Sequence, residues 1–288
     1  MKPFEYIVMT PPDFRGSAGI RFLNQLTDDI RATGRAAHRI YSVTTDKGFL
    51  VSQNGKEYYL SSPEVIRQMA GSPERCIVIH GENQDCKNFE GMNAARYYLN
   101  KIGALKKTGI PREGEFKIAW DLMFCDTPHY VLRTCMLRYP LEAAAHIALD
   151  NRQIDLTYIG KGDIKIAGLT RIPHTLLLRR DWPDNDEEYF YLLKNTRRMY
   201  TYDAVTSVMD DAITLGAMPV LMIDDKAAIE RAREFTYNCV AHVNDDMDEA
   251  MQRFISNRPA YLKAQQDFID QYKRNLEECC VKMEQYFS

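Results

Sequence analysis

The length, composition and charge of this chain suit a globular protein with one large domain or two of ordinary size. Its 288 residues are 45% hydrophobic and carry a formal net charge of −3. This balance excludes a surface that is basic throughout, although it leaves room for local basic patches. No apolar stretch approaches the roughly 18 residues that a membrane-spanning helix needs, and we find no internal repeat.

The seven cysteines stand at irregular spacings, without a C-x-x-C pair. An odd number of cysteines, in a chain whose first apolar run is too short for a secretory signal, indicates reduced thiols. Reduced thiols are typical of the cytosol. We therefore expect a cytoplasmic protein.

The first half of the chain alternates strand patterns with loops and helices. Periodicity predicts a helix over Gly19–Thr33 and strands over Tyr6–Met9, Ala37–Val43, Cys76–His80 and Phe116–Trp120. Asn54-Gly55, between two apolar runs, predicts a hairpin over Phe49–Leu60. Ser61–Glu64 has the residues of a capped helix start, and Met92–Lys101 has the spacing of an amphipathic helix.

A loop rich in glycine joins the first strand to the first helix. The stretch Arg15–Gly19 contains Gly16, a candidate for contact with a ligand. Strand, glycine loop and helix is the form that opens a Rossmann-like half. The loop has neither the Gly-Lys-Ser/Thr ending of a Walker motif nor a full GxGxxG, so a plain turn before a capped helix explains it equally well.

The second half continues with alternating elements. The segment 121–150 is expected to cross between the halves and contains a helical pattern at Leu141–Leu149. Strands are predicted over Leu156–Ile159, Thr175–Leu178, Met199–Tyr202, Pro219–Ile223 and Tyr237–Val243. Helices are predicted over Glu187–Asn195 and Ser207–Leu215, from Asp224 to Glu234, after a cap at Asp245–Asp248, and over Ala260–Phe287.

The stretch Arg198–Ile223 carries the strongest functional pattern. Its first strand ends in Tyr202-Asp203, its helix ends before Gly216, and a second buried strand follows. A strand–helix–strand unit of this kind places a ligand at the carboxyl ends of the strands, near the helix N-terminus. The unit contains two carboxylates eight residues apart, Asp203 and Asp211, with Asp210 as an alternative to Asp211. A solvated acidic turn before a core helix is the competing explanation.

The order acid, seven residues, acid, Ala and a helix closing in Gly-x-x-Pro-Val resembles the nucleotide-sugar site of retaining GT-B glycosyltransferases. This chain has Asp where that family usually has Glu. The stretches YIGKG (158–162) and RRDWPDNDEEYFYLLKNTRRMYTYD (179–203) are similar to bacterial polysaccharide glycosyltransferases. VIHGEN (78–83) and GMNAARYYLNKIG (91–103) give a looser likeness. The resemblance covers residues 150–225 well and 76–103 loosely.

The resemblance implies an α/β fold of two Rossmann-like halves that face a cleft. Residues 1–140 would form the acceptor-side domain and residues 141–265 the donor domain, which binds the nucleotide sugar. Residues 266–288 would form a helix that returns to the first half. The rival interpretation of this helix is an element that binds a partner or another copy of the chain.

The resemblance also implies roles for individual residues. Lys161, between two glycines, would bind the donor diphosphate together with arginines, because arginine grips phosphate in a fork and lysine acts as a point charge. Asp211 would bind the ribose hydroxyls, and no metal is expected. The implied donor-binding set is Gly16, Gly160, Lys161, Arg179, Arg180, Tyr202, Thr206, Ser207 and Asp211. The implied catalytic set is Asp203, Lys161, Arg179 and His80.

The implied reaction moves a sugar from a nucleoside diphosphate to an acceptor hydroxyl, with retention. If the enzyme inverts instead, it needs a general base, for which Asp13, Glu82 and His80 are the candidates. The acceptor is expected to be a glycan or lipid-linked saccharide, as in polysaccharide biosynthesis. A modified DNA base is the alternative, and it would require a basic groove and an extruded base.

Other classes of function compete with glycosyl transfer. Aspartate in place of both glutamates favours a non-catalytic nucleotide-binding protein of the same fold. The lack of GxGxxG after the first strand argues against a nucleotide-dependent oxidoreductase. Asp184-Asn185-Asp186 matches a metal-binding DxD pattern, but its position at a helix start already explains these acids.

Overall fold

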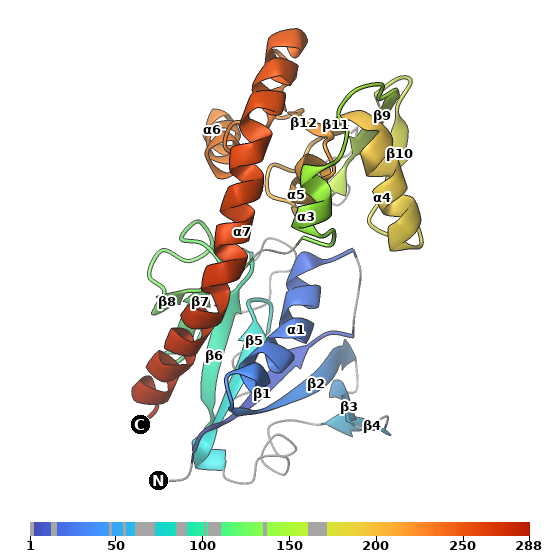
Figure 1. Cartoon of the computed structure of the whole chain (residues 1–288). Helices are drawn as coiled ribbons and strands as arrows, with labels where there is room; N and C mark the ends of the chain where they lie inside the picture. The colour runs from blue at the N-terminus through green and yellow to red at the C-terminus, as the bar shows by residue number, and fades with distance from the viewer. Residues whose placement is uncertain are drawn as a thin grey trace. The chain divides into compact units, whose positions relative to one another are not determined.

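The computed structural model describes residues 3–12, 16–45, 48–53, 56–60, 73–84, 91–100, 102, 111–134, 137–160 and 172–288. The chain divides into two compact units, each with its own sheet (Figure 1). Unit 1 comprises Met1–Thr134 and Phe268–Ser288, and unit 2 comprises Cys135–Asp267. The expected α/β class with two Rossmann-like parts is confirmed, whereas a GT-B arrangement around a cleft stays a prediction.

Unit 1 is built on an eight-stranded sheet in the order β4-β3-β2-β1-β5-β6-β7-β8. The six strands β2, β1, β5, β6, β7 and β8 pair in parallel with their neighbours in this order, whereas β3 pairs antiparallel with both β2 and β4. The strands are β1 (Glu5–Thr10), β2 (Ala36–Thr45), β3 (Gly48–Gln53), β4 (Lys56–Leu60), β5 (Cys76–Gly81), β6 (Asn93–Tyr98), β7 (Phe116–Ala119) and β8 (Tyr130–Val131). Since β2 and β5 flank β1, the strand order reverses there, which is a topological switch point.

In the part of unit 1 that the structure describes, two α-helices pack against the sheet. Helix α1 (Ala18–Ala32) buries one apolar face and is capped by Ser17, whose Oγ accepts a hydrogen bond from the Ile20 amide at 3.4 Å. The last part of α7 (Met247–Tyr286) contacts the sheet, where Tyr6 donates a hydrogen bond to Glu284 at 2.8 Å. This contact joins the first strand of the chain to its last helix.

The predicted helix over Met92–Lys101 is wrong, because most of this segment forms the interior strand β6. Five consecutive residues, Ala94 to Tyr98, are buried between β5 and β7. A strand covered on both faces shows a continuous apolar run rather than alternation, so its pattern is easily taken for that of a helix. The loose likeness over residues 91–103, which assumed a helix, loses its structural basis.

Unit 2 contains a five-stranded, entirely parallel sheet in the order β10-β9-β11-β12-β13. Its strands are β9 (Ile154–Tyr158), β10 (Leu176–Leu178), β11 (Thr196–Thr201), β12 (Met218–Leu221) and β13 (Ala241–His242). Its helices are α3 (Leu141–Ala145), α4 (Asp186–Asn195), α5 (Ser207–Thr214), α6 (Lys226–Phe235) and the first part of α7. Because β10 and β11 flank β9, the switch point of this sheet lies between β9 and β11.

Two arginines, the buried Arg258 and the half-buried Arg152, bind backbone carbonyls in unit 2. Arg258 of α7 donates hydrogen bonds to the carbonyls of Ala144, Ile213 and Thr214. Arg152 donates to four carbonyls, those of Ala148, Leu193, Thr196 and Leu215. Both arginines thus add side-chain donors to carbonyls at or near helix C-terminal ends, where the helix itself leaves acceptors over.

The boundaries of other elements differ from those predicted. Helix α7 runs unbroken over Met247–Tyr286 with Pro259 inside it, although the sequence predicted separate helices on either side. Strand β13 and helix α3 are shorter than expected. The predicted turn Asn54-Gly55 and helix start Ser61–Glu64 lie outside the described residues. None of the helices that the structure describes is both long and apolar enough to cross a bilayer.

Candidate functional site

The candidate site lies at the carboxyl edge of the unit 2 sheet. All five strands are parallel, so the residues that follow them meet at one edge. In chain order these are Gly160 after β9, Arg179 and Arg180 after β10, and Tyr202 and Asp203 after β11. Ligands of open α/β sheets bind at this edge, next to the switch point.

Gly160 and Asp203 meet at the switch point between β9 and β11. Gly160 has φ +64°, a conformation that residues with a side chain rarely adopt. A Cβ at Gly160 would lie 2.8 Å from the Tyr158 ring and 3.0 Å from Asp203 Oδ2. Glycine is therefore required here by both backbone conformation and space, and it leaves the carboxylate beside bare backbone.

The loop between Asp203 and α5 is held by local hydrogen bonds. The Asp203 amide donates to Thr201 Oγ1 at 3.1 Å, and Asp203 Oδ1 accepts from the Val205 amide at 3.2 Å. Thr206 caps α5 by accepting a hydrogen bond from the Val208 amide at 3.4 Å. Asp203, Thr206 and Ser207 are half-buried, so the loop presents polar groups and the positive end of the α5 dipole at the edge.

Arg179 already has a carboxylate partner at this edge. Its Nε and Nη2 donate to the two oxygens of Asp181 at 2.9 and 2.6 Å, a bidentate pair in which both side chains are exposed. The hydrogen bond from Arg179 lowers the pKa of Asp181. A phosphate would have to compete with Asp181 for this guanidinium. Arg180 follows directly and is part of the same turn.

Asp211, the predicted ribose ligand, faces the protein interior. Its side chain is 1% exposed. Asp211 Oδ2 accepts hydrogen bonds from Arg138 Nε at 3.1 Å and from the Tyr189 hydroxyl at 3.0 Å. The Arg138 guanidinium stacks over the Tyr189 ring at 3.8 Å and reaches Asp186 at 3.1 Å. Contact with a ribose would require these bonds to open.

Asp210, the neighbouring carboxylate, has a different environment. Its Oδ1 accepts a hydrogen bond from the Tyr261 hydroxyl of α7 at 2.7 Å. Burial, together with the nearby charge of Asp211, raises the pKa of Asp210 to about 7, against the opposing effect of this hydrogen bond. The two adjacent acids of α5 therefore contact different segments of unit 2.

His80 in unit 1 lies in a buried charged cluster. It is fully buried, with Nε2 3.5 Å from Glu115 Oε1. Arg96 donates to both oxygens of Glu115 at 2.9 and 3.1 Å. Burial opposes the charge of Glu115, but the hydrogen bonds from His80 and Arg96 outweigh it and hold its pKa at about 2. Burial lowers the pKa of His80. These contacts give His80 a structural position, and its predicted catalytic role stays a prediction.

The remaining candidates divide between the edge of unit 1 and the undescribed segments. Glu82 follows β5 and is nearly buried, with its carboxylate accepting from the Leu99 amide at 3.3 Å. Gly16 lies in the turn before Ser17 and α1. Asp13 and Lys161 lie outside the described residues. Unit 1 and unit 2 thus each supply part of the predicted set.

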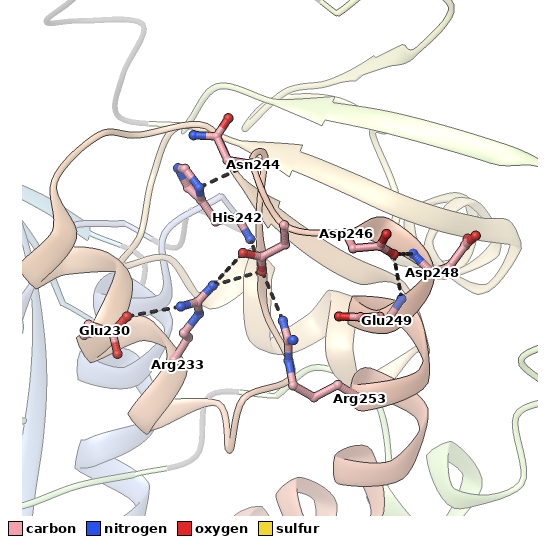
Figure 2. Close-up of polar contacts among 9 residues, drawn as sticks. Glu230, Arg233, His242, Asn244, Asp246, Asp248, Glu249 and Arg253 are labelled. Carbon is pink, nitrogen blue, oxygen red and sulfur yellow. Dashed lines mark hydrogen bonds and ion pairs between the residues drawn. The ribbon is translucent and has the colours of Figure 1, made fainter.

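The structure also reveals a polar cluster that the sequence did not indicate. Figure 2 shows Arg233 of α6 and Arg253 of α7 pointing toward the same place. There, Asp245 accepts hydrogen bonds from Arg233 at 2.9 and 3.0 Å, from Arg253 at 3.1 Å and from the His242 amide at 3.0 Å. The cluster ties α6 and α7 to the end of β13. Asp246 accepts from two amides in the first turn of α7, which confirms the predicted cap.

Arg138 was missed because its partner Asp211 is 73 positions away in the chain. The arginine of a long-range pair carries no local signal. Within the described residues, no group of three or more His, Cys, Asp or Glu side chains could hold a metal ion, and metal independence stays a prediction. Comparison of the sequence with models of protein families and with curated proteins gives no match.

Proposed function

We propose that this protein is a glycosyltransferase that uses a nucleoside-diphosphate sugar. In this proposal the donor binds at the carboxyl edge of unit 2, and the acceptor is a glycan or a lipid-linked saccharide. The observation that carries the proposal is the placement of Gly160 against Asp203 at the switch point. The amino end of α5 starts four residues after Asp203. Bare backbone, a carboxylate and a helix N-terminus suit a ligand that has both sugar hydroxyls and phosphates.

The residues at this edge have distinct proposed roles. The Thr206–Ser207 end of α5 offers backbone amides to the diphosphate, where negative charge grows as the sugar leaves. Arg179 and Arg180 add positive charge once a phosphate displaces Asp181. Asp203 accepts hydrogen bonds from sugar hydroxyls. Lys161 would act with them as a point charge on the diphosphate.

A non-catalytic nucleotide-binding protein is the second candidate. Two observations favour it: Arg179 is paired with Asp181, and Asp211 is used internally by Arg138 and Tyr189. Both pairs reduce the number of charged groups that can stabilise a transition state. Binding of a nucleotide without transfer or hydrolysis of the sugar would identify this function.

The first test is thermal unfolding of the purified chain with UDP, GDP, CMP, dTDP and ADP, each with and without EDTA. A ligand at 100 times its dissociation constant stabilises the folded state by roughly 2.7 kcal/mol. For a protein of this size that corresponds to a rise in Tm on the order of 5 °C. We expect one nucleotide to give this rise, insensitive to EDTA.

Matched variants locate the binding site. Asp203→Asn removes a charge at the carboxyl end of the sheet, and we expect it to abolish the shift. Asp155→Asn removes a charge from β9 near its other end, where Asp155 pairs with Arg197, and should leave the shift intact. Absence of any shift with folded protein would overturn the donor-site proposal. A shift that is followed by release of sugar from the matching nucleotide sugar would favour the enzyme over the binding protein.

A further inference from the structure

Helix α5 holds two segments that are far apart in the sequence. On the side of Asp211 it binds Arg138, with Arg138 Nε and Nη2 at 3.1 and 3.0 Å from Asp211 Oδ2. On the side of Asp210 it binds Tyr261 of α7 at 2.7 Å. The two acids are neighbours in the sequence, so a single turn of one helix carries both contacts.

These two segments lie close to the points where the chain passes from one unit to the other. The boundaries of the units fall at Thr134–Cys135 and at Asp267–Phe268. Arg138 stands shortly after the first boundary, and Tyr261 shortly before the second. Both contacts are made within unit 2. The chain is therefore fastened to α5 soon after it enters unit 2 and again shortly before it leaves.

One partner of each contact is buried, and neighbouring residues support both contacts. Asp211 and Tyr261 are 1% and 0% exposed. The Arg138 guanidinium is stacked on Tyr189, whose hydroxyl donates to the same Asp211 oxygen. Arg258, nearly one turn before Tyr261 on α7, binds the carbonyls of Ile213 and Thr214 at the other end of α5. Helix α7 is thus fixed to α5 at two points, in the middle of α5 and at its C-terminal end.

We propose that α5 is a lock that couples the two chain crossings. The adjacent carboxylates Asp210 and Asp211 hold both crossing segments on one rigid turn, so a disturbance of either contact loosens both segments. Independent contacts would each affect only their own segment. This inference does not depend on the proposed glycosyltransferase activity.

Amide hydrogen exchange of the full chain, followed by mass spectrometry, tests the coupling. Two sets of amides report: those of α3, such as Ala144, which bonds to the Pro140 carbonyl at 3.0 Å, and those of α7 around Tyr261. Tyr261→Phe removes one hydroxyl, and Arg138→Met removes one charge. We expect each substitution to raise exchange about tenfold or more in both sets.

The control is Arg197→Met, which removes an arginine of unit 2 from its exposed pair with Asp155 and should change neither set. If Arg138→Met does not fold, Asp211→Asn weakens the same contact while keeping the shape of the side chain. Faster exchange in both sets of amides, after Tyr261→Phe as well as after Arg138→Met, supports the lock. Faster exchange only near the substituted residue, or no change in either set, would overturn it.

Discussion

Replacement of Glu115 by Gln should destabilise unit 1 more than any surface substitution. Glu115 and Arg96 are both fully buried, and the two hydrogen bonds between them would lose their charged acceptor. Removing one partner of a buried ion pair leaves the other charge uncompensated, which costs about 3–5 kcal/mol. The pKa of Glu115, lowered from 4.5 to about 2, corresponds to about 3 kcal/mol through linkage.

The assay uses the position of the tryptophans. The chain has two, and Trp120 lies in unit 1, where its indole donates to the Thr134 carbonyl at 3.1 Å. With Trp182 of unit 2 replaced by Phe, the fluorescence of Trp120 follows the urea unfolding of unit 1. Asp28→Asn is the control, because Asp28 is half-exposed and each of its ion pairs, with Arg31 and with Arg39, should contribute less than about 1 kcal/mol.

The dependence on pH gives the sharper test. A carboxyl group whose folded pKa is lowered stabilises the protein above its unfolded pKa, and this stabilisation is lost as the pH falls through the folded value. The difference in stability between the native chain and Glu115→Gln should therefore be full at pH 7 and shrink between about pH 4.5 and 2. A difference below about 1 kcal/mol at pH 7, or one that does not change with pH, would refute the reasoning.

Three further predictions concern unit 2. Gly160→Ala should cost about 1–3 kcal/mol, and more than Gly34→Ala in unit 1, because Gly34 also has positive φ (+84°) but open space around its Cβ position; urea unfolding of each unit measures both. The native chain should lose up to about 4 kcal/mol of stability as the pH rises from about 4 to 7, because folded Asp210 holds its proton more tightly than unfolded Asp210 does. Asp210→Asn should abolish this dependence on pH, and denaturation at pH 5 and pH 8 checks it. Arg258→Met removes three buried hydrogen bonds to carbonyls and should cost about 3 kcal/mol. Arg253→Met loses one bond to a half-buried carboxylate and should cost less; equal effects in urea unfolding would contradict the difference in burial.

The sequence predicted those parts of the fold that local patterns determine. Helix α5 begins at Ser207 as predicted and ends one residue before the predicted Leu215, ahead of Gly216, which has φ +84°. The helix predicted at β6 failed because a strand buried on both faces loses its alternation. The separate helices predicted on either side of Pro259 failed because packing of α7 maintains a helix that local propensity would end.

The position of the candidate site could be predicted from the order of strands and helices rather than from the identity of single residues. The edge positions of Gly160 and Asp203 followed from recognising strands and their ends. The inward direction of Asp211 could not be predicted, because it is set by Arg138 and Tyr189, which approach from elsewhere in unit 2. A carboxylate on a helix near a ligand edge has the same local sequence whether it faces a ligand or an arginine.

The contact between Tyr6 and α7 has a consequence for the order in which the protein matures. Tyr6 donates hydrogen bonds to the Cys280 carbonyl and to Glu284, partners 274 and 278 positions further along the chain. Unit 2 is thus inserted within the sequence of unit 1. During synthesis, unit 2 is complete before the last part of α7, which contacts β1, has been translated. Unit 1 can close only after translation has reached the final turns of α7, and a fragment that stops at Thr134 would leave the face of β1 that this helix covers open to water.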